Sequence, residues 1–432
     1  MAKNRIRRIE RIEQNLIRII QQPGADKGHP WPVRLLLATL RGFSAVFAGI
    51  VSVRRLFYRI GICRRYPLGC QVISVGNITA GGTGKTPVVE IFARELQKSG
   101  RRVAILSRGY RKRELPWWQR MFKENIAPPR VVSDGHSLLL DSEMGGDEPY
   151  MLACNLPGVV VLVDKNRVKS GRYAVKRFKC DTLILDDGFQ YWKLQRMLEV
   201  VLVDMTNPLG NGHLLPRGIL REPKRNLKRA DVIFITKSNG DSTELRQQIR
   251  ALNGKAEIIE CRHQPRYLRN VYTARHEPLE WLKGKTVTTL SGIATPQGFE
   301  DSLRKLGAKV IHCERYADHH RYSAQEIIDA VNRADSHKAD ALLTTEKDAV
   351  RFPRLETTPV PVYYLRVDIE LLSGTESFHD AVERICFRKP APPARAVHRA
   401  ARIESNRVES SRIESSRTEL NCDGGLGETA LP

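Results

Sequence analysis

The sequence predicts an α/β protein with a membrane-associated helix near its N-terminus. Short runs of Val, Ile and Leu alternate with helical stretches, which is typical of a parallel sheet covered by helices on both faces. The glycine-rich stretch ITAGGTGKTPVVE, residues 78–90, follows an apolar strand and opens a helix. This context predicts a P-loop NTPase-like sheet domain, and a second, smaller alternation of strands and helices follows it.

The first 65 residues carry a strong excess of positive charge. They contain 14 Lys and Arg residues and three acidic residues. The resulting charge, 14 − 3 = +11, is almost half of the formal net charge of +23. In residues 5–20, apolar side chains recur every three or four positions with arginines between them, which predicts an amphipathic helix. We therefore expect a basic amphipathic extension over residues 1–30 and an anionic partner or surface.

Residues 31–65 predict a membrane-associating helix. Its charge-free core, residues 42–53, would rise only about 18 Å as a helix, less than the roughly 30 Å hydrocarbon core of a bilayer. A longer span would include Arg41, which is costly in mid-membrane. Aromatic residues flank the core in the manner of interface anchors: Trp31, Phe57 and Tyr58. The pattern favours an interfacial or shallowly inserted helix over a spanning one, with both ends on the cytoplasmic side.

The remaining chain divides into two groups of strands and a tail. Residues 66–250 form the predicted P-loop domain, with apolar strands at 71–75, 102–106, 159–163, 182–185, 200–203 and 232–235. The runs TVTTLSG, KVIHC, ALLTT and VPVYYL predict a smaller α/β domain over residues 251–388, and residues 240–284 give the weakest pattern. Residues 389–432 repeat R-x-E-S with little apolar surface, which predicts a disordered tail.

The glycine loop departs from the usual G-x-x-x-x-G-K-[ST] pattern, because its first position is a threonine. A phosphate-binding loop needs bare backbone N–H groups, a lysine for the phosphate oxygens and a hydroxyl for Mg²⁺. Later glycines and the Lys-Thr pair supply all three, so we predict that the whole loop binds the nucleotide. A plain glycine-rich turn is the alternative. The residues concerned are Thr79, Ala80, Gly81, Gly82, Thr83, Gly84, Lys85 and Thr86.

Carboxylates and histidines suited to phosphoryl transfer stand at strand and helix ends. Asp186 and Asp187 end a buried strand, where carboxylates near a P-loop are placed to bind Mg²⁺. Asp147 follows two glycines at a predicted helix start and could accept a proton from a hydroxyl, although ordinary helix capping is the alternative. His319 and His320 lie in the second domain and are plain surface residues unless they face the loop.

Composition disfavours two classes of protein. Eight cysteines are scattered without a C-x-x-C pair, which predicts reduced thiols in a cytosolic setting and no disulfide frame or zinc site. The positive charge would suit nucleic acid, but no RNP, zinc or helix-turn-helix pattern supports that partner. We therefore infer no nucleic-acid partner.

In this order, the motifs resemble the tetraacyldisaccharide 4'-kinase family of lipid A synthesis. The matching pieces cover roughly residues 31–370 and are SVGNITAGGTGKTP, ILSRGY, GGDEP, DDGFQ, NPLGNGHLLPRGILREP, DHHRYS and TEKDAVRF. The resemblance implies transfer of the γ-phosphate of ATP to the 4' hydroxyl of a tetraacylated glucosamine disaccharide 1-phosphate, giving lipid IV-A. The family's loop carries G-G-T-G-K-T without the early glycine, so Thr79 is a mark of the family.

The resemblance also implies roles for single residues. Asp147 would act on the hydroxyl with His319, with His320 as the alternative, and Lys85 would stabilise the migrating group. The implied substrate or phosphate contacts are Arg108, Tyr110, Glu148, Arg167, Arg221 and Glu222. The implied Mg²⁺ contacts are Thr86, Asp186 and Asp187. The chain departs from the family at Arg111, Tyr191 and Arg217, and none of these departures removes a catalytic group.

The implied setting is the cytoplasmic face of the inner membrane, to which the protein would be bound as a peripheral or monotopic enzyme. Its partners would be the acylated disaccharide 1-phosphate and the anionic membrane surface, and no obligate protein partner is inferred. A membrane-cycling ATPase switch of the MinD type is the rival interpretation. Ala80, which stands where those proteins have a signature lysine, argues against it.

Overall fold

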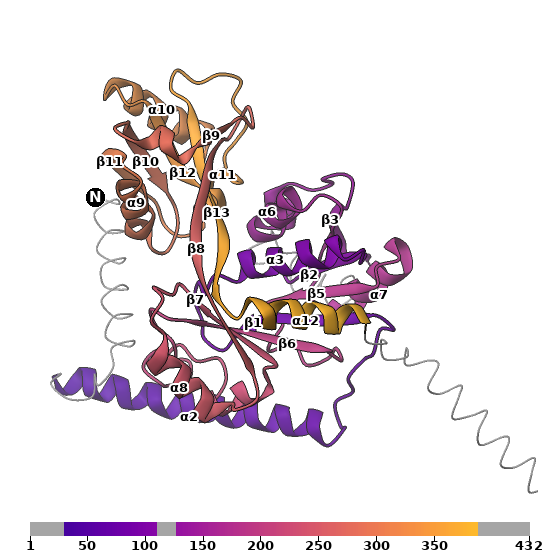
Figure 1. The fold of residues 1–432 in the computed structure, drawn as a ribbon. Helices are drawn as coiled ribbons and strands as arrows, with labels where there is room; N and C mark the ends of the chain where they lie inside the picture. The colour runs from indigo at the N-terminus through magenta and orange to yellow at the C-terminus, as the bar shows by residue number, and fades with distance from the viewer. Residues whose placement is uncertain (1–29, 110–126, 388–432) are drawn as a thin grey trace, which may run out of the picture.

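The computed structural model describes residues 30–109 and 127–387 (Figure 1). The predicted basic extension, Tyr110, Arg111 and the R-x-E-S tail lie outside the described residues. The described strands form one sheet in the order β11-β10-β12-β13-β8-β7-β6-β1-β5-β2-β4-β3, and β9 pairs with β8. The expected α/β class with a P-loop sheet domain, a second α/β unit and an N-terminal apolar helix is confirmed.

The first half of the sheet contains the strand that leads into the glycine loop. β1 (Gln71–Asn77) pairs in parallel with β5 (Thr182–Asp186) and β6 (Leu198–Asp204). Every residue of β1 and β5 is buried, and both strands supply apolar side chains to the cores on the two faces of the sheet. The other strands of this half are β2 (Val103–Ser107), β3 (Arg130–Asp134), β4 (Val160–Val163) and β7 (Val232–Thr236).

Helices cover both faces of this first half. On one face, α3 (Lys85–Lys98) and α12 (Thr375–Phe387) meet in a core where Phe92 contacts Phe234 and Phe378 edge to face. On the other face, α7 (Arg167–Phe178) covers a second core. The remaining helices of this half are α5 (Ser142–Gly145), α6 (Asp147–Asn155), η1 (Lys224–Arg229) and α8 (Thr243–Leu252).

The second half is smaller and has its own two cores. Three strands pair in parallel, and one helix packs in each core. The strands are β10 (Thr286–Ser291), β11 (Lys309–Arg315) and β12 (Ala341–Thr345), and the shorter elements are β9 (His276–Pro278), η2 (Leu279–Leu282) and α11 (Glu346–Ala349). The helices are α9 (Pro296–Lys305) and α10 (Ala324–Ser336), and a complete capping box of Ser323 and Glu326 starts α10.

Two long antiparallel strands join the halves, as Figure 1 shows. β8 (Glu257–Asn270) begins beside β7, β13 (Val362–Ser373) begins beside β12, and the two strands pair along most of their length. The weak pattern at 240–284 has a physical cause: the middle of β8, RHQPR, crosses between the halves and is only partly buried. The division into domains at residue 250 stays a prediction, since β8 bonds to both halves.

α2 (Trp31–Arg59) lies along one side of the molecule with most of its apolar side chains uncovered (Figure 1). Its buried contacts include Leu37 and the Ser44 hydroxyl, which donates to the Leu214 carbonyl at 2.8 Å. The expectation that Tyr58 anchors a membrane interface is wrong. Tyr58 is buried and packs edge to face on Trp192, with ring centroids 5.7 Å apart.

Close packing beside β1 gives a test of the fold. A Cβ on Gly76 would lie 2.7 Å from both the Cβ and the backbone nitrogen of Phe189. We expect Gly76→Ala to destabilise the protein by about 1–3 kcal/mol, because overpacking forces the backbone to move. Gly298→Ala is the control, since nothing lies within 4 Å of its added Cβ. Equal denaturation midpoints for the two variants would contradict this packing.

Candidate functional site

The glycine loop connects β1 to α3 and leaves its central residues open. Gly81 and Gly84 have φ values of +114° and +76°, a region that side-chain-bearing residues rarely adopt. A Cβ on Gly81 or Gly82 would find no atom within 4 Å. The backbone at these residues is therefore approachable by a phosphate at the start of α3, where backbone N–H groups and the helix dipole favour anions.

The start of the loop is pinned to the segment that precedes Arg221. Thr79 forms a β-bridge with Leu220, and the Ala80 N–H donates to the Ile219 carbonyl at 2.6 Å. A bridged residue has extended backbone and does not need glycine, which explains physically why a threonine is accepted at this position. On the other side, the Thr236 hydroxyl donates to the Thr83 carbonyl at 2.9 Å.

Lys85 and Arg221 converge on one carboxylate. The Lys85 Nζ is 3.6 Å from an Asp187 oxygen, and Arg221 Nη1 donates to both Asp187 oxygens at 2.8 and 2.9 Å. Burial acts to raise the pKa of Asp187, but the charges of Lys85 and Arg221 outweigh it and lower the pKa. Asp187 is therefore ionised at neutral pH.

Asp186 has a different environment from its neighbour. Burial, together with the negative charges of Glu148 and Asp187, raises its pKa to about 6. A bound cation would relieve this repulsion. The part of the chain that the structure describes contains no cluster of three His, Cys, Asp or Glu ligands. Mg²⁺ does not need one, because it binds through one or two carboxylates, substrate phosphates and water. The oxygen-bearing residues here, including buried Thr86, fit that ion.

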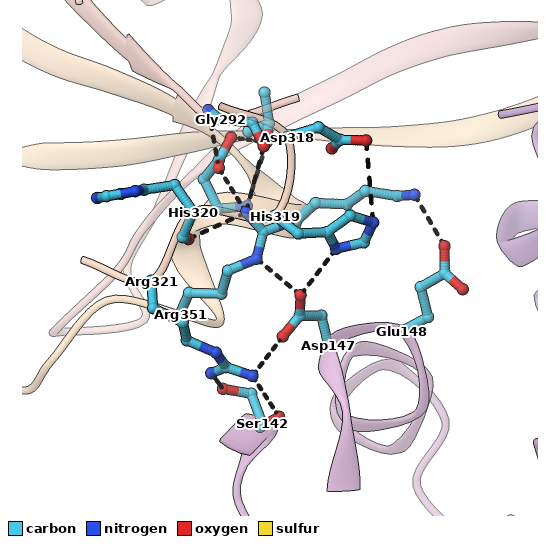
Figure 2. Close-up of polar contacts among 12 residues, drawn as sticks. Ser142, Asp147, Glu148, Gly292, Asp318, His319, His320, Arg321 and Arg351 are labelled. Atoms are coloured by element: carbon cyan, nitrogen blue, oxygen red, sulfur yellow. Dashed lines mark hydrogen bonds and ion pairs between the residues drawn. The ribbon is translucent and has the colours of Figure 1, made fainter. Parts of the chain in front are cut away.

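Asp147 is the meeting point of the two halves, as Figure 2 shows. It is the first residue of α6, and its carboxylate accepts three hydrogen bonds from the second half. The donors are His319 Nδ1 at 3.1 Å, Arg351 Nε at 2.8 Å and Arg321 Nη2 at 2.9 Å. Burial acts to raise its pKa, but the His319 bond and the two arginine charges lower the pKa overall. Asp147 is therefore a carboxylate at neutral pH.

The two histidines have different surroundings. His319 is the one that contacts Asp147, and its φ of +63° is uncommon for a residue with a side chain. His320 Nε2 lies 3.1 Å from Glu326 Oε1, and its ring stacks on Tyr316 at 4.6 Å between centroids. The structure thus brings His319, and not His320, to the carboxylate.

Glu148 follows Asp147 in the first turn of α6 and also pairs with the second half of the sheet. Lys347 donates to its carboxylate at 3.0 Å. Burial acts to raise the pKa of Glu148, but the charges of Lys347, Lys85 and His319 lower it overall. Lys85 of the loop and His319 thus act on the same carboxylate, and α6 packs in one core with α3, the helix that the loop opens.

The other expected substrate residues have mixed placements. Arg108 is exposed just after β2. Arg167 is buried and donates to the Asp186 carbonyl at 2.9 Å. Glu222 is 1% exposed and accepts from Asn226 and Arg229, so the expected direct substrate contact of Glu222 does not fit its position. Its carboxylate instead supports Asn226, to which Arg55 of α2 donates.

Sequence reasoning missed Arg321 and Arg351, although both lie in the motifs DHHRYS and TEKDAVRF. Arg321 also donates to the hydroxyl and carbonyl of Ser142, at 3.0 and 2.8 Å. The available signal was the position of each arginine within a motif that also holds acidic or histidine residues. Neither the partner nor the burial of either arginine follows from that position, because Asp147 is far away in the sequence.

Comparisons with known proteins agree with this geometry. A family model described as tetraacyldisaccharide-1-P 4'-kinase matches residues 36–386. The tetraacyldisaccharide 4'-kinase of Syntrophus aciditrophicus is 37% identical over 370 residues, covering 83% of this chain and 95% of its own. That of Anaeromyxobacter sp. (strain K) is 39% identical over 375 residues, covering 85% and 93%.

A solved structure agrees with the sequence relatives. LpxK from Aquifex aeolicus, solved in complex with ATP, has a TM-score of 0.64 and 29% sequence identity to this chain. The match covers 81% of this chain and 99% of that one. The chain therefore belongs to the tetraacyldisaccharide-1-P 4'-kinase family.

Proposed function

We propose that the protein transfers the γ-phosphate of ATP to the 4' hydroxyl of tetraacyldisaccharide 1-phosphate, forming lipid IV-A. The observation that carries this proposal is the contact of Asp147 with His319 at the start of α6, which packs in one core with α3, the helix that the glycine loop opens. The loop supplies a phosphate site, and the pair supplies a proton acceptor for an alcohol. Family membership over residues 36–386 covers both halves of the sheet and leaves no observation that favours a MinD-type switch.

In this proposal, the residues act by positioning and charge neutralisation, which is what phosphoryl transfer requires. The loop, residues 79–86, binds the phosphates through backbone N–H groups, and Lys85 balances their charge. Asp147 and His319 accept the proton of the attacking hydroxyl as a hydrogen-bonded pair. Mg²⁺, when bound near Thr86, Asp186 and Asp187, would supply further neutralisation of the phosphate oxygens.

Positive residues near the loop suit a substrate that carries a phosphate. Arg108 is exposed, and Arg221 lies beside Lys85 on Asp187. We propose that Arg108 and Arg221 contact phosphate groups, and that buried Arg167 supports the Asp186 turn. Glu222 would act indirectly, by holding Asn226, to which Arg55 of α2 donates. Tyr110 and Glu148 stay proposed substrate contacts.

We further propose that α2 binds the surface of an anionic membrane on its cytoplasmic side. The helix is long and apolar enough to cross a bilayer, and 11% of its most apolar window is buried. Polar contacts tie it sideways to the protein, among them Ser44 to Leu214, Arg54 to Gln190 and Arg55 to Asn226. Because one face of α2 is bonded to the protein, the helix would lie parallel to the membrane surface. An interfacial position then explains both the bonded face and the exposed apolar face.

The direct test is transfer of labelled phosphate from Mg-ATP to tetraacyldisaccharide 1-phosphate in detergent micelles. We expect a doubly phosphorylated lipid from the native protein. Lys85→Ala and Asp147→Asn should each lower kcat by about 10²- to 10⁴-fold, because each removes a charge or proton acceptor used in the transition state. Thermal melting checks that both variants are folded. A native protein that makes no such lipid would sink the kinase proposal.

The adjacent histidines give a matched pair of variants. We expect His319→Gln to lower kcat by at least about 10²-fold, since it removes the group that contacts Asp147. His320→Gln should keep kcat within a few-fold, because His320 contacts Glu326 and Tyr316 instead. Steady-state kinetics on both variants checks this. A larger loss of kcat in His320→Gln than in His319→Gln would assign the catalytic role to His320.

The bare face of α2 can be tested with vesicles that contain phosphatidylglycerol. Phe43 and Ile50 are 60% and 61% exposed. We expect Phe43→Glu with Ile50→Glu to weaken vesicle binding by at least about tenfold, because apolar burial and charge attraction are both reduced. Ile328→Glu, on the exposed side of α10, is the matched control and should bind like the native protein. Unchanged flotation of the double variant with vesicles would exclude this face as the contact.

A further inference from the structure

Arg351 is a buried arginine that binds Asp147 and the backbone next to His319, the two members of the proposed catalytic pair. It follows α11, and its side chain is 0% exposed. Its Nε donates at 2.8 Å to Oδ2 of Asp147, the same oxygen that lies 3.1 Å from His319 Nδ1. The guanidinium thus reaches from the second half of the sheet to a carboxylate of the first half (Figure 2).

The other end of the guanidinium is fixed to the backbone around His319. Nη1 donates to the Gly292 carbonyl at 3.3 Å and to the His320 carbonyl at 3.4 Å. The Gly292 carbonyl also accepts the backbone N–H of His319 at 3.1 Å. One side chain therefore constrains the carboxylate and the peptide that carries the histidine.

A further partner, Asp348, keeps the arginine itself in place. Nη1 lies 3.1 Å from Asp348 Oδ1, which also accepts from the Gly292 N–H and the Tyr322 hydroxyl at 3.0 and 2.9 Å. A Cβ on Gly292 would come within 2.7 Å of that hydroxyl, so only glycine fits here. These contacts hold His319 at its uncommon positive φ, because a backbone of this kind persists only where its surroundings fix it.

Arg321 touches the same carboxylate in a different way. Its side chain is 43% exposed, and it binds Asp147 Oδ1 together with Ser142. A solvent-exposed arginine is free to exchange partners at modest cost, whereas a buried guanidinium with several acceptors is not. The two arginines therefore have separate roles at Asp147.

We propose that Arg351 is a positioning residue that sets the distance between Asp147 and His319 and so assembles the proton-accepting pair from the two halves of the sheet. This inference rests on the proposed role of that pair. Arginine is required because the contact with Asp147 uses Nε while the contacts with the His319 loop use Nη1. A lysine ammonium is a single point and cannot span both groups.

The decisive experiment separates kcat from KM in Arg351→Lys. We expect kcat to fall at least about 10²-fold, as misplacement of a reacting group by about 1 Å does. KM for Mg-ATP and for the tetraacyldisaccharide 1-phosphate should stay within about threefold, since Arg351 touches neither the glycine loop nor Arg108 and Arg221. Arg354→Lys, an exposed arginine on the same segment, is the matched control and should keep native kinetics.

Guanidinium rescue distinguishes positioning from a purely structural role. In Arg351→Ala, added guanidinium ion should raise kcat at least about tenfold, because a free guanidinium can occupy the vacated position between Asp147 and the His319 loop. If Arg351→Ala does not fold, Arg351→Lys decides. A near-native kcat in Arg351→Lys would overturn the inference, and so would a loss of kcat/KM that comes from a raised KM alone. Failure of guanidinium to raise the kcat of a folded Arg351→Ala would also overturn it. Native kcat in Asp147→Asn would instead overturn the proposed role of the pair.

Discussion

The pairing of β8 with β13 is the constraint on which the site depends, because it fixes how the two halves of the sheet face each other. A buried arginine reinforces it. Arg366 of β13 binds Glu90 of α3, and its Nη1 donates to both Glu346 oxygens at 2.8 and 3.0 Å. α3 is the helix that the glycine loop opens, so this contact ties that helix to the second half. A buried pair of this kind is costly to break once one partner is removed.

Charge pairing explains why the site carboxylates differ. Asp147 and Asp187 each accept bonds from arginine, and their pKa values are lowered despite burial. For Asp186, burial and the negative charge of Glu148 outweigh the nearby cations, and its pKa is raised. The arrangement thus keeps two carboxylates ionised by fixed protein charges and leaves the third to gain from a bound cation.

The sequence predicts those features of the fold that local residue patterns determine. Strands that are buried on both faces are largely apolar, as β5 and β7 are, and the loop is recognisable from the strand before it and the helix after it. β8 was missed because its crossing segment is polar. The contact of Asp147 with His319 joins residues 172 positions apart, and no local signal reports such a pairing. Glu222 and Tyr58 were misjudged for the same reason, since a residue type does not reveal its burial.

The segment 214–221 connects α2 to the glycine loop. At one end it holds α2, because Ser44 donates to Leu214 and accepts from the Arg217 N–H at 3.0 Å. At the other end, Ile219 accepts from Ala80, and the Arg221 N–H donates to the Ile78 carbonyl at 2.8 Å. If the bare face of α2 lies on a membrane, these few bonds fix the height of the phosphate loop above it. An acylated substrate keeps its chains in the bilayer, so its sugar hydroxyl would meet the loop at a depth that the protein itself sets.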